Sequence, residues 1–130
     1  MSHKCLQSGK ILLVGNQNVG KTTIISTFLG YDTIEFSSNP SYFYKEKFIH
    51  FDQKDEKDRK ESKKNKVEKF GFSIYDTNGL PYYRYIALFL SRNVDVVFLV
   101  YNRCRKETFE QIINFWHFQI GSINKNIGKF

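Results

Sequence analysis

Residues 10–30 of the chain, KILLVGNQNVGKTTIISTFLG, decide its fold. The apolar run at 11–14 stops at Gly15, which is typical of a short strand buried on both faces of a sheet. From Gly20 onward the apolar residues recur at the spacing of an amphipathic helix, and Gly30 is a suitable residue to end it. The side chains expected on the buried face of this helix are Ile24, Ile25, Phe28 and Leu29. The stretch therefore predicts a buried strand, a glycine-containing turn and a helix in direct succession.

The turn, GNQNVGKT at 15–22, fits the pattern G-x-x-x-x-G-K-[ST] at every fixed position. Glycines let such a loop wrap a phosphate closely, and its backbone N–H groups and the helix N-terminus attract an anion. Lys21 is then expected to reach the β- and γ-phosphates of a nucleotide, and the Thr22 hydroxyl to bind Mg²⁺. The predicted phosphate-binding residues here are Gly15, Asn18, Val19, Gly20, Lys21, Thr22 and Thr23. The alternative is a glycine turn followed by a solvated lysine, and the flanking strand and helix patterns argue against it.

The rest of the chain predicts strands and helices in alternation. Strands are expected over 42–51, 70–75 and 94–101, and helices over 81–92 and 105–120. The apolar positions that define the two helices are Ile86, Leu88, Phe89 and Leu90 in the first and Phe109, Ile112, Ile113, Trp116 and Ile120 in the second. The order β-α-β-β-α-β-α indicates an α/β fold: an open, mostly parallel sheet with helices on both faces and one hairpin.

A second motif, D-T-N-G at 76–79, follows the strand expected over 70–75. An acidic side chain at the end of such a strand suits a water-mediated hold on Mg²⁺, which assigns Asp76 to the metal. The N–H of Gly79 is expected to contact a γ-phosphate and to move when that phosphate leaves. By itself D-x-x-G also fits an ordinary strand-to-helix turn, but its place after the first motif favours phosphate sensing.

With both motifs in place, the chain resembles the Ras superfamily of small GTPases, and within it the Rab branch. The matching text is KILLVGNQNVGKTTIISTF and FSIYDTNGLPYYRYIALFLSRNVDVVFLVYNRCRKETFEQIINFW. The residues in register with the Rab pattern are Asp76, Thr77, Gly79, Tyr83, Val100, Tyr101, Glu107, Phe109 and Trp116. The resemblance implies a P-loop NTPase fold, one small-GTPase-like domain over 1–130, and GTP or GDP with Mg²⁺ as ligands. It also implies a switch of vesicle and membrane trafficking that orders 31–42 and 76–85 around the γ-phosphate and binds effector or regulatory proteins there.

Three departures from the family pattern bear on hydrolysis. The glutamine that orients the attacking water in the family follows D-x-x-G, and here that position is Leu80, which neither donates to nor accepts from water. Gln17 stands where the family prefers a small residue. The switch threonine that closes over Mg²⁺ is replaced by Pro40, with Ser41 as the nearest hydroxyl. Weaker candidates for that role are Thr33, Ser37 and Ser38. No firm catalytic residue is assigned, and intrinsic GTP hydrolysis is expected to be weak or absent.

The guanine-reading motifs of the family, N-K-x-D and S-A-K, do not occur in the sequence. Asn124 and Lys125 resemble the start of the first, but Ile127 stands in place of its aspartate. We therefore expect 121–130 to be an Asn-rich frayed tail and the fold to lack its C-terminal strands and helices. Selectivity for guanine over adenine is implied by the resemblance alone.

Composition limits the other function classes. A chain of 130 residues with 41% hydrophobic residues fits one small domain with a packed core. Its two cysteines, Cys5 and Cys104, cannot build a disulfide framework or a four-cysteine zinc site. The net charge of +7 suits an anionic partner, but 52–69 mixes eight basic with six acidic side chains and is expected to be a disordered loop insertion. No nucleic-acid partner is expected.

No signal peptide, membrane-spanning run or lipidation motif is visible in the sequence. The chain is therefore expected to be cytoplasmic and to reach the cytosolic face of endomembranes only indirectly.

A partner surface is expected at three tyrosines near the start of the helix predicted over 81–92: Tyr82, Tyr83 and Tyr85. The resemblance suggests it, because the second switch of the family binds partners there, although core packing would explain the same aromatic residues. The alternative to a GTP-binding switch is a non-enzymatic interaction module, a degenerate GTPase that keeps this surface and does not bind nucleotide productively.

Overall fold

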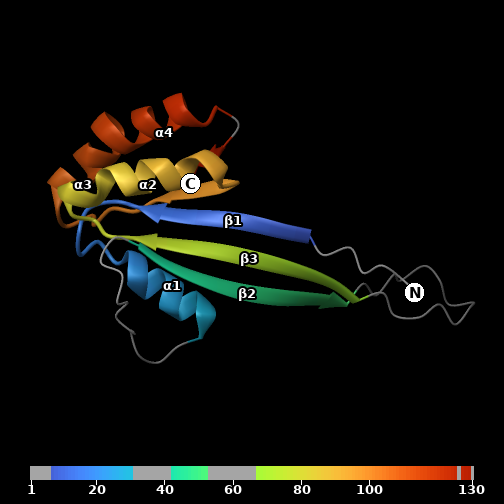
Figure 1. The fold of residues 1–130 in the computed structure, drawn as a ribbon. Helices are drawn as coiled ribbons and strands as arrows, with labels where there is room; N and C mark the ends of the chain where they lie inside the picture. Colours follow the sequence, from blue (N-terminus) through green and yellow to red (C-terminus); the bar gives the residue numbers. More distant parts are fainter. Residues whose placement is uncertain (1–6, 31–41, 53–66, 126, 130) are drawn as a thin grey trace, which may run out of the picture.

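The computed structural model describes residues 7–30, 42–52, 67–125 and 127–129. In these residues the predicted order of elements is confirmed, and Figure 1 shows their arrangement. The strands are β1 Gln7–Val14, β2 Tyr42–Asp52, β3 Val67–Thr77, β4 Val96–Leu99 and β5 Gly128–Lys129. The helices are α1 Lys21–Leu29, α2 Arg84–Leu90, α3 Lys106–Gln111 and α4 His117–Ile123. Two 3-10 helices, Pro81–Tyr83 and Ser91–Asn93, flank α2, and a π-helical segment, Ile112–Trp116, joins α3 to α4.

Strand β1 lies inside a five-stranded sheet of order β2-β3-β1-β4-β5. It runs parallel to β3 on one side and to β4 on the other, whereas β2 and β3 form an antiparallel hairpin. Leu13 of β1 is paired with Asp76 of β3. Because the carboxyl ends of parallel strands meet at one edge of a sheet, the two phosphate-site motifs start side by side.

The side chains of β1 point alternately into two separate cores. Leu12 and Val14 belong to the larger core, and Leu13 belongs to a smaller one. The larger core also contains Ala87, Val94, Val97, Ile112, Trp116 and Ile120, and the smaller one Ile25 and Ile74. Figure 1 shows α1 on one face of the sheet and α2, α3 and α4 on the other. The predicted P-loop-type α/β architecture, with helices on both faces, is therefore confirmed.

Several apolar residues predicted on buried helix faces are exposed instead: Ile24, Phe28, Phe89, Phe109 and Ile113. From α3 to α4 the buried apolar residues are Ile112, Trp116 and Ile120, which are spaced by four. The wider turn of the π-helical segment keeps that four-residue row aligned with the core. A regular helical spacing would have included the two exposed positions, Phe109 and Ile113.

The charged stretch 52–69 is partly strand. The β2–β3 ladder continues outward until Asp52 pairs with Val67, because backbone pairing does not require apolar side chains. Residues 53–66 lie outside the described residues, so the disorder expected there stays a prediction.

The expected frayed tail over 121–130 is wrong for the residues of it that are described. Helix α4 continues to Ile123, Ile127 packs against the larger core, and β5 pairs in parallel with β4. The described part of the tail packs in this way because it has apolar surface to bury and a sheet edge to join.

One side-chain amide ties the end of α4 to the segment between α2 and β4. Nδ2 of Asn124 donates to the carbonyl oxygens of Ser91, Arg92 and Val94, at 3.1, 3.4 and 3.3 Å. Asn124 therefore serves the fold, as its lack of a following aspartate already indicated, and does not begin a base-reading motif.

Replacing Asn124 tests this anchor. We expect Asn124→Ala to lower the free energy of unfolding by about 1–3 kcal/mol, because partly buried carbonyls lose their donors. Asn124→Asp should cost more, because a carboxylate would then face the same carbonyls. Urea unfolding at neutral pH measures both, with the exposed neighbour Lys125→Ala as control. Equal stability of the wild type and Asn124→Asp would contradict the anchoring role.

Candidate functional site

The phosphate loop, residues 15–22, leaves the end of β1 and enters α1 through conformations that suit glycine. The φ angles are +152° at Gly15, +61° at Asn18 and +102° at Gly20. A Cβ at Gly15 would lie 2.1 Å from the carbonyl oxygen of Val100, so only glycine lets the loop run this close to the end of β4. Left-handed residues of this kind turn successive N–H groups toward one point and form a nest for an anion.

Lys21 is buried at the start of α1, with 5% of its surface exposed. Its Nζ donates to the carbonyl oxygens of Gly15 at 3.0 Å and Asn16 at 2.7 Å, so the ammonium closes the loop from inside. Burial lowers the pKa of Lys21 to about 8, against the opposing effect of the Asp76 carboxylate. A buried ammonium bonded to neutral carbonyls is a group that a bound phosphate would stabilise.

Thr22 and Asp76, which the sequence assigned to one metal ion, are in contact. The Oγ1 hydroxyl of Thr22 donates to Oδ2 of Asp76. Burial raises the pKa of Asp76, while the Thr22 hydrogen bond and the Lys21 ammonium act in the opposite direction. Its other carboxylate oxygen, Oδ1, is buried and accepts no hydrogen bond from the described residues.

These oxygens fit the magnesium ion that the motifs predict. A hydroxyl and a carboxylate are ligands that Mg²⁺ prefers, and the unused Oδ1 of Asp76 has capacity for a metal-bound water. Across the described ranges no three His, Cys, Asp or Glu side chains gather into a metal site. A magnesium ion here would therefore share its coordination with phosphate and water, as this metal commonly does with nucleotides.

The D-T-N-G turn lies directly on the phosphate loop. A Cβ at Gly79 would be 2.3 Å from the backbone nitrogen of Gln17 and 2.4 Å from the carbonyl carbon of Asn16. The turn is held by its own side chains, since the backbone nitrogen of Leu80 donates to Oδ1 of Asn78 at 2.9 Å. The two motifs are thus in direct backbone contact.

Three further predicted residues, Val19, Thr23 and Leu80, lie on or beside the two motifs. Val19 is half-buried beside Gly15, and Thr23 is exposed on α1 with its carbonyl accepting the Thr27 hydroxyl. Leu80 is exposed. The switch candidates Thr33, Ser37, Ser38, Pro40 and Ser41 lie outside the described residues, and the predictions about them stay predictions.

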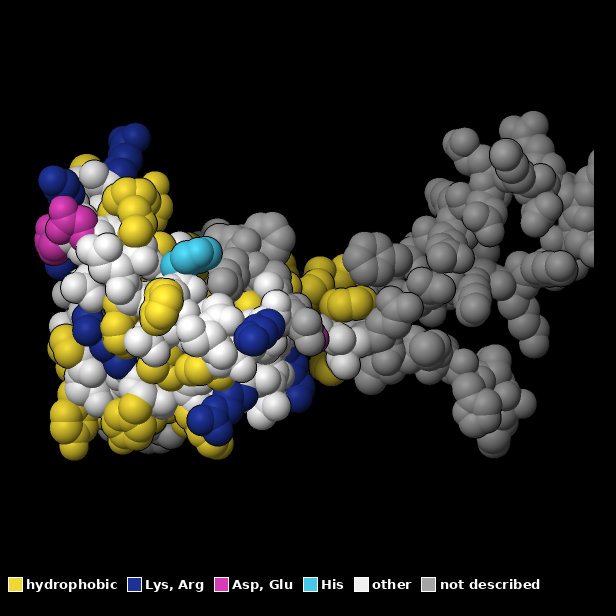
Figure 2. All heavy atoms as spheres, turned by 90° about the horizontal axis from the view of Figure 1, so that it is seen from above, with side chains coloured by type: hydrophobic (Ala, Val, Ile, Leu, Met, Phe, Trp, Pro, Cys, Tyr) yellow, Lys and Arg dark blue, Asp and Glu magenta, His cyan; other side chains and the backbone are white. Residues whose placement is uncertain are grey.

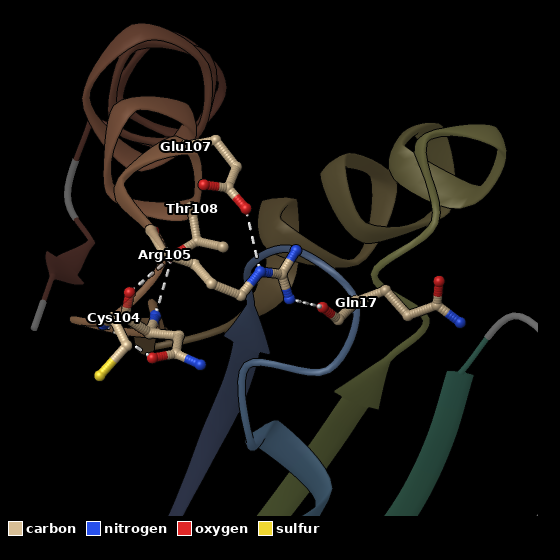
Figure 3. Close-up of polar contacts among 6 residues, drawn as sticks. Gln17, Cys104, Arg105, Glu107 and Thr108 are labelled. Carbon is tan, nitrogen blue, oxygen red and sulfur yellow. Dashed lines mark hydrogen bonds and ion pairs between the residues drawn. The ribbon is translucent and has the colours of Figure 1, made fainter.

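One charged side chain reaches the loop without having been predicted there. Figure 3 shows Arg105 between Glu107 and Gln17. Its Nη1 donates to the backbone carbonyl of Gln17 at 3.4 Å, and its Nε donates to Oε1 of Glu107 at 2.9 Å. The sequence analysis placed residue 105 only at the start of the helix expected over 105–120. The usable signal was its position after β4, whose end meets the end of β1.

The face formed by α2, α3 and α4 exposes hydrophobic side chains, with Lys and Arg between them (Figure 2). We call this surface the aromatic face, because its large exposed side chains include Tyr82, Tyr85, Phe89, Phe109 and Phe118. Tyr82 and Tyr85 are 76% and 64% exposed, whereas Tyr83 is half-buried against Tyr82. A pocket of about 480 Å³ opens on this face, lined by Tyr85, Ile86, Leu88, Phe89, Arg92 and Ile123. In the described part of the chain, no helix has the length and apolarity to cross a bilayer.

A buried loop lysine, a contact between Thr22 at the start of α1 and Asp76 near the end of β3, and a D-x-x-G turn on the loop define a nucleotide-binding domain of the Ras-like P-loop class. The model of one family, described as "Roc: Ras of Complex, Roc, domain of DAPkinase", matches residues 10–129. The chain belongs to this family, which is Ras-like, so guanine nucleotide and Mg²⁺ are the ligands that the family implies. A search of curated proteins finds no match.

Gly79→Ala tests the contact between the two motifs. The new Cβ would overlap the backbone at Asn16 and Gln17, so we expect the free energy of unfolding to fall by about 1–3 kcal/mol. Thermal or urea unfolding measures the loss, with Leu80→Ala at the exposed next position as control. Unchanged stability of Gly79→Ala would contradict the observed approach.

The pKa of Lys21 predicts a dependence of stability on pH. It is lowered from 10.5 to about 8, so between these values the unfolded chain binds more protons and the free energy of unfolding should rise with pH. The rise should reach about 3 kcal/mol for this group. In Lys21→Met this part of the rise should be missing, as measured by urea unfolding from pH 7 to 10.5 without nucleotide or Mg²⁺. Parallel curves for the two chains would contradict the buried ammonium.

Proposed function

We propose that this chain is a GTP-dependent molecular switch with weak intrinsic hydrolysis. The observation that carries the proposal is the backbone contact of Gly79 with the phosphate loop at Asn16 and Gln17. A loop that binds phosphate and a turn that senses it are useful together only when they are mechanically connected.

Different residues of the chain would bind the phosphates and the Mg²⁺. The backbone of 15–20 orients the phosphates, and Lys21 leaves its carbonyl partners to neutralise charge on the β- and γ-oxygens. Thr22 and Asp76 would hold Mg²⁺, which supplies further neutralisation when bound. Leu80 offers no polar atom to orient a water, so the triphosphate state is long-lived.

The switch itself is the movement of 76–85 away from the loop when the γ-phosphate is lost. A γ-phosphate seated over Asn16 and Gln17 would take its hydrogen bond from Gly79, at the point where the two backbones touch. The matching movement of 31–42, assigned from the Ras-like pattern, completes the proposal.

Effector or regulatory proteins would bind the aromatic face and distinguish the two positions of 76–85 there. Tyr82 and Tyr85 are the exposed tyrosines beside the turn, and Tyr85 also lines the pocket on that face. The Rab-like branch, a role in vesicle trafficking and a cytoplasmic location on endomembrane surfaces rest on the sequence resemblance.

A second candidate is an interaction module without productive nucleotide binding. Two observations favour it: Lys21 satisfies the carbonyls of its own loop, and Leu80 replaces the water-orienting glutamine. The module would use the same aromatic face, so nucleotide binding separates the two candidates.

Lys21→Ala is the first test. Loss of the buried ammonium should weaken GTP and GDP binding by at least about a hundredfold, because a charge-assisted contact to phosphate is lost in a buried site. Calorimetry with Mg²⁺ measures the affinity, and circular dichroism confirms that the variant is folded. Unchanged affinity in Lys21→Ala would remove the proposal.

Leu80→Gln tests the hydrolysis assignment. We expect phosphate release from bound GTP to increase about tenfold or more, as expected where one water-positioning group is restored. Leu80→Met, which changes shape and adds no amide, is the matched control. If nucleotide binds and Leu80→Gln remains as slow as the wild type, the role given to position 80 is wrong.

A further inference from the structure

The crest of the phosphate loop, residues 16–18, is held from two sides. On one side Gly79 lies against the peptide between Asn16 and Gln17. On the other, Nη1 of Arg105 donates to the carbonyl of Gln17, which belongs to the next peptide (Figure 3). The second contact comes from the β4–α3 connection, which the phosphate-site motifs do not include.

The backbone that carries Arg105 is firmly fixed. Oγ1 of Thr108, a residue with no exposed surface, donates to the carbonyl of Arg105 at 2.7 Å, and the backbone nitrogen of Arg105 donates to the carbonyl of Asn102 at 2.9 Å. The β4–α3 connection begins at Val100, whose carbonyl oxygen lies against Gly15 of the phosphate loop. The β4–α3 connection therefore contacts the phosphate loop at both its base and its crest.

The guanidinium is also oriented. Its Nε is paired with Oε1 of Glu107 at 2.9 Å, and hydrogen bonding to its own backbone and to Arg105 lowers the pKa of Glu107, so the pair stays charged at neutral pH. With Nε occupied by Glu107, the Nη1 edge faces Gln17. The side chain of Arg105 is 42% exposed, so the pair itself contributes little to stability.

The Gln17 carbonyl and the Asn18 N–H are the two ends of one peptide group. A cation bonded to the carbonyl polarises the peptide and makes its N–H a stronger donor. Asn18 has a left-handed φ of +61°, a conformation that helps to build an anion nest. Its backbone N–H is also one of the groups that the loop motif predicts to bind phosphate.

We propose that Arg105 is a positioning residue of the phosphate site. It holds the Gln17 carbonyl outward and polarises the Gln17–Asn18 peptide toward a bound phosphate, without touching the phosphate itself. This inference rests on the proposed nucleotide-binding function, and it adds the β4–α3 connection to the parts that set nucleotide affinity. Lys21 supplies charge inside the loop, and Arg105 acts from outside it through the backbone.

The test compares two arginines of one loop. Arg105→Ala should weaken GDP binding by about three- to tenfold, the range for a partly exposed charge-assisted hydrogen bond. Arg103→Ala removes the same charge from an exposed position two residues away and should change the affinity less than about twofold. Arg105→Lys, which keeps the charge and a donor, should recover part of the loss. Calorimetry with Mg²⁺ measures all three.

A second measurement does not depend on nucleotide. In the nucleotide-free chain, amide hydrogen exchange at residues 16–18 should be faster in Arg105→Ala than in the wild type, with exchange in β1 and β3 unchanged. If the wild type binds no GDP, the proposed function fails, and exchange alone decides whether Arg105 holds the crest. Equal effects of the two alanine variants, unchanged exchange at 16–18, or faster exchange throughout the sheet would each overturn the role of Arg105.

Discussion

The phosphate loop depends on two close approaches of backbone to backbone. At Gly15 the loop lies against the carbonyl of Val100, and at Gly79 the D-T-N-G turn lies against Asn16 and Gln17. Neither approach leaves room for a Cβ, which requires glycine at both positions. The carboxyl ends of strands β1, β3 and β4 therefore meet in one tightly packed region. The parallel pairing of β1 with both neighbours makes this convergence possible, because all three carboxyl ends reach the same edge of the sheet.

Inside that region the chain keeps charges that are costly without a ligand. Burial lowers the pKa of Lys21 and raises that of Asp76, so desolvation drives both groups toward neutrality. The two side chains and Thr22 partly compensate one another, yet Lys21 bonds only to carbonyls and Asp76 keeps one unused oxygen. A polyanion with its divalent cation would satisfy both groups at once. The stored electrostatic cost thus favours the ligands that the Roc family implies.

Much of this site could be predicted from the sequence because its signals are local. The glycine positions, the lysine at the helix start and the apolar runs each indicate one strand, turn or helix. The structure contains the strands and helices that they indicate. The sequence assigned Thr22 and Asp76 to one metal ion, and the structure adds the direct hydrogen bond between them. Contacts between distant segments were harder: Arg105 on Gln17 depends on the side-chain path from a neighbouring strand, which no local pattern encodes. The anchored Asn124 was missed because its three acceptors lie some thirty residues earlier in the chain. The aromatic residues of the last helix were misplaced because a π-helical segment changes the spacing of its buried row.

The most direct test of the central claim, that these parts form a working phosphate site, is calorimetric titration of the folded chain with GDP, GTP and ATP, with and without Mg²⁺. We predict that GDP and GTP bind, that Mg²⁺ tightens the binding, and that ATP does not compete with GDP. A demonstrably folded chain that takes up neither guanine nucleotide would contradict the account and leave the aromatic face as the basis of its function.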